Sequence, residues 1–266
     1  MTAVVNERQA RRIVVVFGGG SSDTGVAGVL ASLVSESGTD ITGVFLEDRS
    51  LLRLAELPFT TELCRITTTR RRLTPRELER QMKIQAVRAE QAVRSVAERA
   101  GSHWSFRTHR GRLSTALAEA RDMDLLLLGT ARQVLASAGE LRATARMVQA
   151  GKAESLQPVA VLFDHTDTAA RALEAGIGLA DRAGRGLIVF LSDEAREARA
   201  DLTRQLQSLG PKRAAIRTVP GPDVLLAAVR RAAPVVLIVG AGETGFEEAR
   251  IGVLQRELRC PMVVVR

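Results

Sequence analysis

The feature of this sequence that most constrains its fold is a series of short apolar runs, rich in Val, Ile and Leu, that alternate with stretches of helical character. Continuous apolar strands separated by helices are typical of a parallel sheet covered on both faces. The sequence therefore predicts an α/β fold. The predicted strands are residues 13–17, 41–47, 104–110, 124–129, 158–163, 186–192, 214–219, 234–240 and 261–266.

The same order of elements occurs twice along the chain. The segment THRG at 108–111 matches TVPG at 218–221, which lies 110 residues later, and LLLLG at 125–129 then matches VLIVG at 236–240. Each half is therefore expected to form one β-α-β-α-β-α-β unit. Only the second half shows a clear fifth strand, at the chain end, so we expect five strands in the second sheet and five or only four in the first.

The two predicted domains, 1–157 and 158–266, differ in length mainly through an insert at 48–73 that follows the second strand. The insert combines several leucines and Phe59 with three consecutive arginines, Arg70–Arg72. It follows the end of the sheet where open α/β folds bind ligands. We expect it to form a lid on its own domain, a dimer contact or a surface for a protein partner; for the arginines, ordinary solvated surface is the alternative.

The clearest helix is predicted between Thr74 and Gly101. Thr74 has the character of an N-cap, Pro75 suits the first turn, and Glu77 completes a capping box. The helix is expected to run to Ala100, because Gly101 is typical of a helix end.

Composition narrows the function. The chain carries 38 basic against 30 acidic residues, a net charge of +8, yet aromatic residues make up only 3% and Tyr is absent. Base-stacking surfaces need aromatic side chains, so the sequence argues against a nucleic-acid partner. No apolar run approaches the roughly 20 residues of a membrane-spanning helix. The two cysteines, Cys64 and Cys260, form no disulfide framework and no metal-type spacing. We therefore expect a cytoplasmic protein with no membrane contact and no bound metal.

Three segments carry a resemblance to a known family. They are VAVLFDHTDTAARAL at 159–173, TVPGPDVLLAAVRRA at 218–232, and VVLIVGAGETG with CPMVVVR within 235–266. Together they resemble the universal stress protein family in its tandem two-domain form, and the two units cover nearly the whole chain. The resemblance implies that each domain is a doubly wound, open parallel sheet of five strands in the order 3-2-1-4-5, and that the domains pair as in a dimer. Since 261–266 would end its sheet as an edge, we also expect a homodimer formed through this strand.

Nucleotide-binding members of that family carry an Asp after the first strand and the pattern G-x2-G-x9-G-[S/T] after the fourth. The resemblance implies that Asp164 receives adenosine hydrogen bonds and that Gly240, Gly242 and Gly245 let backbone N–H groups approach phosphates. The pattern departs at its end, where Gln255 stands in place of the last Gly. We therefore expect at most weak ATP binding in the second domain.

The first domain departs further from the nucleotide-binding pattern. Gly18 stands where the Asp is expected, and Arg132 and Arg142 stand at the later glycine positions after Gly129. The first domain is therefore predicted to bind no ATP in the manner of the family. The glycine-rich segment 18–25 remains a candidate anion cradle, with a plain strand-to-helix loop as the alternative.

The segment GAGETG at 240–245 also fits the glycine pattern of dinucleotide-binding folds. That reading needs an acidic residue at the end of a following strand, whereas the last strand ends at Arg266. A tight strand-to-helix turn is the simpler alternative. The histidines, His103, His109 and His165, belong to no catalytic or metal-binding motif, so we predict no catalytic residue.

The function that the resemblance implies is that of a non-enzymatic stress-response regulatory or binding protein. Two alternatives stay open. One is an enzyme that hydrolyses ATP slowly or transfers adenylate; the other is a partner-binding protein that has lost nucleotide binding.

Overall fold

The computed structural model describes most of the chain. The described residues are 12–18, 23–34, 38–47, 49–63, 69–111, 115, 123–129, 157–193, 195–209, 213–241, 254, 257–258 and 260–266. The expected boundary near residue 157 borders a segment outside these ranges and stays a prediction.

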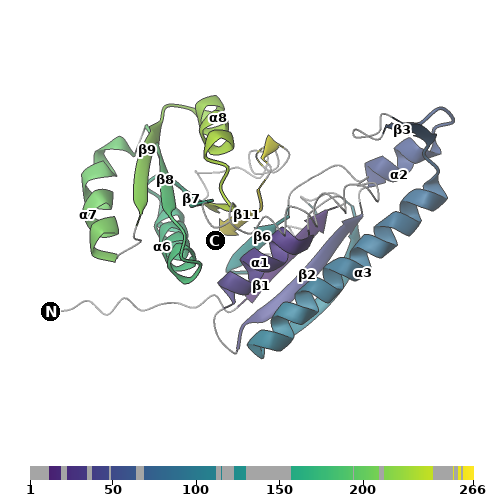
Figure 1. Ribbon diagram of the computed structural model, residues 1–266, viewed down its shortest axis with the longest axis horizontal. Helices are drawn as coiled ribbons and strands as arrows, with labels where there is room; N and C mark the ends of the chain where they lie inside the picture. Colours follow the sequence, from purple (N-terminus) through teal and green to yellow (C-terminus); the bar gives the residue numbers. More distant parts are fainter. Residues whose placement is uncertain are drawn as a thin grey trace.

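Within the described residues, one nine-stranded sheet runs through both halves of the molecule (Figure 1). Its strand order is β5-β2-β1-β6-β11-β10-β7-β8-β9. The first half thus contributes the order 3-2-1-4 and the second half 3-2-1-4-5, the order that the family resemblance implies. The strands are β1 (Arg12–Gly18), β2 (Asp40–Glu47), β5 (His103–Arg110), β6 (Leu125–Leu128), β7 (Val159–Phe163), β8 (Leu187–Ser192), β9 (Ala214–Val219), β10 (Val236–Gly240) and β11 (Met262–Val265).

The two halves join through β6 and β11, the one antiparallel pair of this sheet among the described strands. Leu128 lies opposite Met262 and Leu125 opposite Val265. Two expectations are corrected here: the sheets are fused rather than separate, and β11 is an interior strand rather than an edge open to a second chain. Both strands are buried along their whole length, so pairing removes two apolar edges from water at once.

Because β6 bonds to β1 on one side and β11 on the other, β11 takes the place that a fifth strand of the first half would have. The edges of the joined sheet are instead β5 and β9.

Apolar side chains fill both faces of the sheet. One face packs against α1 (Asp23–Leu33), α3 (Pro75–Ala100), α6 (Asp167–Arg182) and α7 (Arg199–Leu209), the last preceded by a short 3-10 turn, η2 (Arg196–Ala198). The other face packs against α8 (Pro222–Ala232) and the side chains of Leu254 and Leu258. Alternate residues of β1 enter the two layers, as expected for a strand covered on both sides. No helix in the described ranges is long and apolar enough to cross a membrane.

The capping residues of α3 behave as the sequence predicts. The Thr74 side chain accepts a hydrogen bond from the Glu77 backbone N–H at 3.3 Å. At the other end, Gly101 adopts a left-handed conformation with φ of 62° and directs its N–H to the last turn, a geometry that favours glycine. The insert between β2 and α3 forms α2 (Arg49–Glu56) and a small antiparallel pair, β3 (Thr61–Leu63) and β4 (Arg70–Arg72). Figure 1 shows this unit at the end of the molecule where α3 begins.

Candidate functional site

The candidate site lies at the carboxyl ends of β7 and β10 in the second half. The chain leaves β7 through α6 toward β8, whereas β10 lies on the opposite side of β7. This reversal is the point where open α/β sheets place ligands. Asp164 directly follows β7 and Gly240 ends β10, and continuing the Ile238–Val161 register sets Gly240 beside Phe163. The structure therefore brings together two of the four residues that the sequence singled out.

Asp164 is held in a local turn at the start of α6. Its Oδ1 accepts hydrogen bonds from the Thr166 backbone N–H at 3.2 Å and from the Thr166 hydroxyl at 2.7 Å. Thr166 in turn caps α6, because its Oγ1 accepts from the Ala169 backbone N–H at 3.2 Å. His165 between them has a φ of 70°, so the turn bends through the left-handed region. Among the described residues no donor contacts Oδ2, which leaves that oxygen able to accept a bond from a ligand.

Gly240 has a packing role of its own. A Cβ at this position would lie 2.6 Å from the Ala169 backbone nitrogen, 2.6 Å from the Thr168 carbonyl carbon and 2.8 Å from the Thr168 oxygen. The end of β10 thus approaches the first turn of α6 more closely than any side chain permits. Gly240 thus lets the N-terminus of α6, which is the positive end of the helix dipole, lie close to the end of β10. Gly242 and Gly245 lie outside the described residues.

The equivalent place in the first half lacks the carboxylate. Gly18 ends β1 where Asp164 follows β7, and nothing lies within 4 Å of where its Cβ would be. Gly129, at the end of β6, donates its N–H to the Val16 carbonyl at 2.9 Å. Half of the glycine-rich segment 18–25 that could cradle an anion, residues 19–22, falls outside the described residues.

The histidines do not assemble into a catalytic group. The His165 ring packs against Phe163, with 5.7 Å between ring centres, while His103 and His109 lie at opposite ends of the edge strand β5. No group of His, Cys, Asp and Glu within the described ranges is arranged to hold a metal ion.

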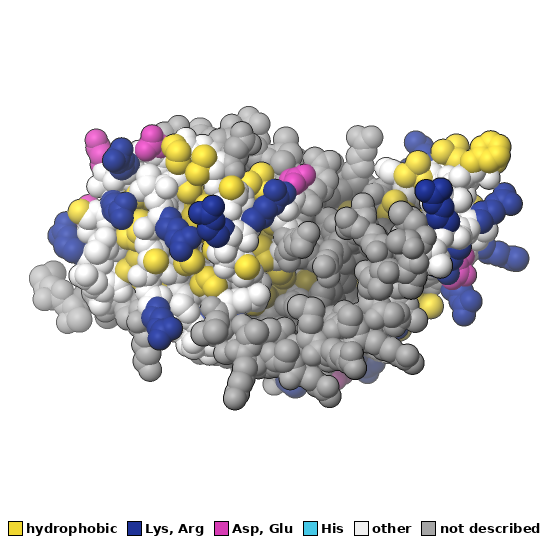
Figure 2. All heavy atoms as spheres, turned by 45° about the horizontal axis from the view of Figure 1, so that its top comes forward, with side chains coloured by type: hydrophobic (Ala, Val, Ile, Leu, Met, Phe, Trp, Pro, Cys, Tyr) yellow, Lys and Arg dark blue, Asp and Glu magenta, His cyan; other side chains and the backbone are white. Residues whose placement is uncertain are grey.

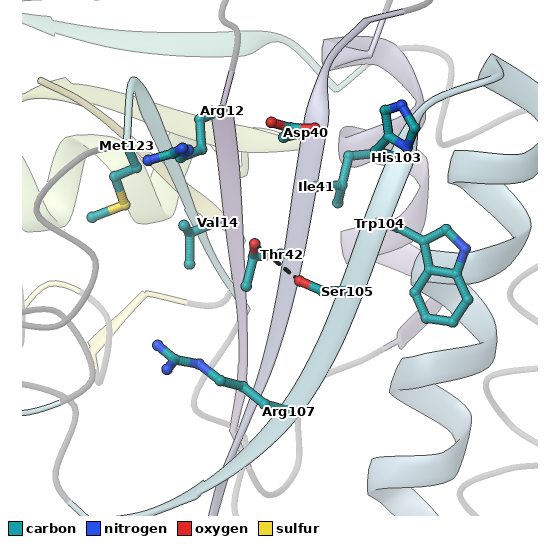
Figure 3. A pocket seen from close by; sticks show the side chains of 10 residues that line it. All are labelled: Arg12, Val14, Asp40, Ile41, Thr42, His103, Trp104, Ser105, Arg107 and Met123. Atoms are coloured by element: carbon teal, nitrogen blue, oxygen red, sulfur yellow. Dashed lines mark hydrogen bonds between the residues drawn. The ribbon is translucent and has the colours of Figure 1, made fainter.

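A second hollow, which sequence reasoning missed, lies on the first half of the sheet (Figure 3). It has a volume of about 510 Å³, and the Ser105 hydroxyl donates to the Thr42 hydroxyl at 3.2 Å on its floor. Alternating polar residues of β2 and β5 line this hollow. The alternation is visible in the sequence and could have predicted the hollow. Its upper rim comes from the amino ends of the strands, opposite to the end where such folds bind ligands. The lining residues are Arg12, Val14, Asp40, Ile41, Thr42, His103, Trp104, Ser105, Arg107 and Met123.

The insert has a side that packs on its own domain and a side that is exposed. Leu51 and Leu52 pack against the core and Ala55 is buried, so one side of α2 is a structural cover. Leu57 and Phe59, which follow α2, are 55% and 91% exposed. Figure 2 shows hydrophobic and basic side chains close together at this end of the molecule.

Comparison with known proteins gives structural matches alone. No protein-family model matches the sequence, and no curated protein matches it. A crystal structure of a universal stress protein from Archaeoglobus fulgidus superposes with a TM-score of 0.51 and 12% identity, covering 96% of this chain and 96% of that one. The chain has the universal stress protein fold. A universal stress protein from Burkholderia pseudomallei is also similar, at 18% identity and a TM-score of 0.33, covering 42% of this chain and 96% of that one.

Cys260 lies just before β11. We expect its thiol to be unreactive at neutral pH. Burial raises the pKa of this thiol from 9.0 to about 11. Because the thiolate is the nucleophile, two pKa units make alkylation about a hundredfold slower near pH 8. Peptide mass spectrometry after iodoacetamide treatment should show labelling that accelerates as the pH rises toward 11. Equal labelling rates for Cys260 in native and urea-unfolded protein at pH 8 would contradict this.

Proposed function

We propose that this chain is a non-enzymatic regulatory or binding protein of the universal stress type, acting in the cytoplasm, whose second half binds an adenine nucleotide weakly. One observation carries the proposal. Asp164 and Gly240 lie at the ends of neighbouring strands, where the chain connections reverse direction, and Gly240 packs closely against the first turn of α6. The open acceptor Oδ2 suits a ribose or adenine donor, and the nearby helix N-terminus suits a phosphate.

The proposal assigns the binding function to one half only. The first half has Gly18 where the second has Asp164, so it lacks the acceptor. Binding is expected to be weak for two reasons. Asp164 Oδ1 already accepts a hydrogen bond from the Thr166 hydroxyl, and the sequence lacks the last glycine of the family pattern. The His165 ring, which lies next to Asp164 in the chain, packs against Phe163, and this favours binding over ATP hydrolysis or adenylate transfer.

Replacing Asp164 by alanine tests the site. Isothermal titration calorimetry with ATP should show one weak site on the wild-type chain. Asp164→Ala should weaken it by about tenfold to a hundredfold, since a hydrogen bond to a charged group contributes about 1.5–3 kcal/mol. Asp181→Ala is the matched control, because Asp181 is an exposed carboxylate at the far end of the same helix.

Two results would overturn the nucleotide proposal. Wild-type protein that gives no heat with ATP would leave the partner-binding alternative. Unchanged binding by Asp164→Ala would place the nucleotide elsewhere. Slow release of phosphate or adenylate that Asp164→Ala abolishes would instead favour the enzyme.

A homodimer is a further part of the proposal, and the fused sheet changes where it can form. Because β11 is paired on both sides, a second chain has to use another surface, such as the edge strands β5 and β9. Sedimentation velocity at tens of micromolar should give the mass of two chains, and a single-chain mass there would refute the dimer.

A further inference from the structure

Three apolar side chains on the insert form an exposed cluster, here called the apolar knob: Leu54, Leu57 and Phe59. Leu54 is 49% exposed, Leu57 55% and Phe59 91%. Large exposed apolar groups gathered in one place mark interaction sites more often than single ones do. The knob stands at the end of the molecule that carries α2 and β3 (Figures 1 and 2).

The apolar knob is held in a fixed shape. The Leu57 N–H donates to the Leu54 carbonyl at 3.2 Å, and the Thr60 hydroxyl donates to the same carbonyl at 2.6 Å. The Thr60 N–H donates to the Leu57 carbonyl at 3.2 Å, and the Leu73 N–H ties the turn to the start of α3 by donating to Thr60. A preorganised turn loses little conformational freedom on binding, and here the backbone that carries these side chains is already ordered.

Exposed basic side chains lie on the same insert as the knob. Arg53 on α2 and all three residues of β4, Arg70–Arg72, are exposed. Glu56 is an exposed acid between Leu54 and Leu57 in the chain. An apolar centre with a charged rim is the usual anatomy of a protein interface, where Phe and Arg are enriched. Because arginines outnumber Glu56 on this surface, we expect the partner to be negatively charged.

Two other occupants fit the surface less well. A second copy of this chain would bring one arginine-rich rim against another, on a protein whose net charge is already +8. A membrane surface takes up amphipathic helices through a continuous apolar face, but α2 turns Leu51, Leu52 and Ala55 toward its own core. What remains outside is a small knob of three side chains rather than a continuous apolar face.

We propose that the apolar knob, Arg70 and Arg72, two arginines that share one face of β4, form a docking site for an acidic segment of another protein. An apolar residue of that segment packs on Phe59, and its carboxylates pair with these two arginines. The site is separate from the Asp164 crevice, and its function does not depend on nucleotide. Arginine suits this pairing because its planar fork can hold a carboxylate through two bonds.

A defined peptide probe tests the proposal. Immobilised full-length protein is used, without nucleotide, to select from a displayed library of random short peptides, and the selected sequences are synthesised and titrated by fluorescence anisotropy. The expected consensus combines Asp or Glu with Leu, Phe or Trp. Phe59→Ala should weaken binding by about tenfold or more, and glutamate at both Arg70 and Arg72 should abolish it.

Control variants separate docking from folding and from the nucleotide site. Val224→Ala removes an apolar side chain of similar exposure, 47%, on α8 in the other half, and it should bind the peptide as the wild type does. Asp164→Ala should also bind normally. The melting temperature of Phe59→Ala should equal that of the wild type, because Phe59 is almost fully exposed.

Four outcomes would overturn the proposal. The first is a selection that enriches no acidic consensus, and the second is unchanged peptide binding by Phe59→Ala. The third is binding to phosphatidylserine vesicles, in place of peptide, that depends on Phe59. The fourth is self-association in sedimentation that depends on Phe59. The last two would assign the knob to a membrane or to a second copy of the chain.

Discussion

Replacing Leu127 by aspartate is expected to destabilise both halves of the protein together. Leu127 is fully buried in β6, where it lies opposite Val15 on one side and Val263 on the other. An unpaired charge there has no hydrogen-bond partner. Substitutions that bury such a charge are among the most destabilising and lower the free energy of unfolding by on the order of 4–5 kcal/mol. Chemical denaturation should show the loss, and hydrogen exchange should show faster opening in β7 and β8 as well as in β1.

The control for this substitution is Val224→Asp, which places the same charge on the exposed side of α8. It should change the free energy of unfolding by only about 0.5 kcal/mol. If Leu127→Asp opened the first half while β7 and β8 kept their wild-type protection, the two halves would be independent and the fused sheet would be wrong.

Replacing Gly240 by alanine is expected to have the second largest effect. The added methyl would sit 2.6 Å from backbone atoms of Thr168 and Ala169, and backbone cannot rotate away as a side chain can. Overpacking of this kind costs about 1–3 kcal/mol, and the first turn of α6 has to shift. We therefore expect a lower melting temperature together with weaker ATP binding.

Gly28 offers a matched glycine control. It lies inside α1, and nothing is within 4 Å of where its Cβ would be. Gly28→Ala should stabilise the protein by about 0.5–1 kcal/mol, because glycine disfavours helix interiors by that amount relative to alanine. If Gly240→Ala were as stable as the wild type, the close approach of β10 to α6 would not be what this glycine is for.

Local and periodic signals predicted much of the fold. The limits of α3 followed from Thr74 and Gly101, whose conformations depend on their immediate neighbours. The existence of the strands followed from the apolar runs, whereas their order in each half was implied by the resemblance to the universal stress protein family. The choice of Asp164 and Gly240 was implied by the same resemblance.

Contacts between distant segments could not be predicted in the same way. An apolar strand such as β11 pairs equally well with a second chain or with β6, and its sequence is the same in both cases. The division of the insert into partly buried Leu52 and exposed Phe59 depends on how α2 meets α3. The use of Asp164 Oδ1 by Thr166 depends on a single left-handed residue, His165.

The measurement that tests the proposed function most directly is an ATP titration of isotope-labelled protein followed by backbone amide NMR. The account predicts shifts that cluster at 164–169 and at Gly240 and Ala241, fit one site per chain, and leave Gly18 and Gly129 unchanged. Shifts at Gly18 and Gly129, or no shifts at 164–169 at saturating ATP, would contradict a single nucleotide site in the second half.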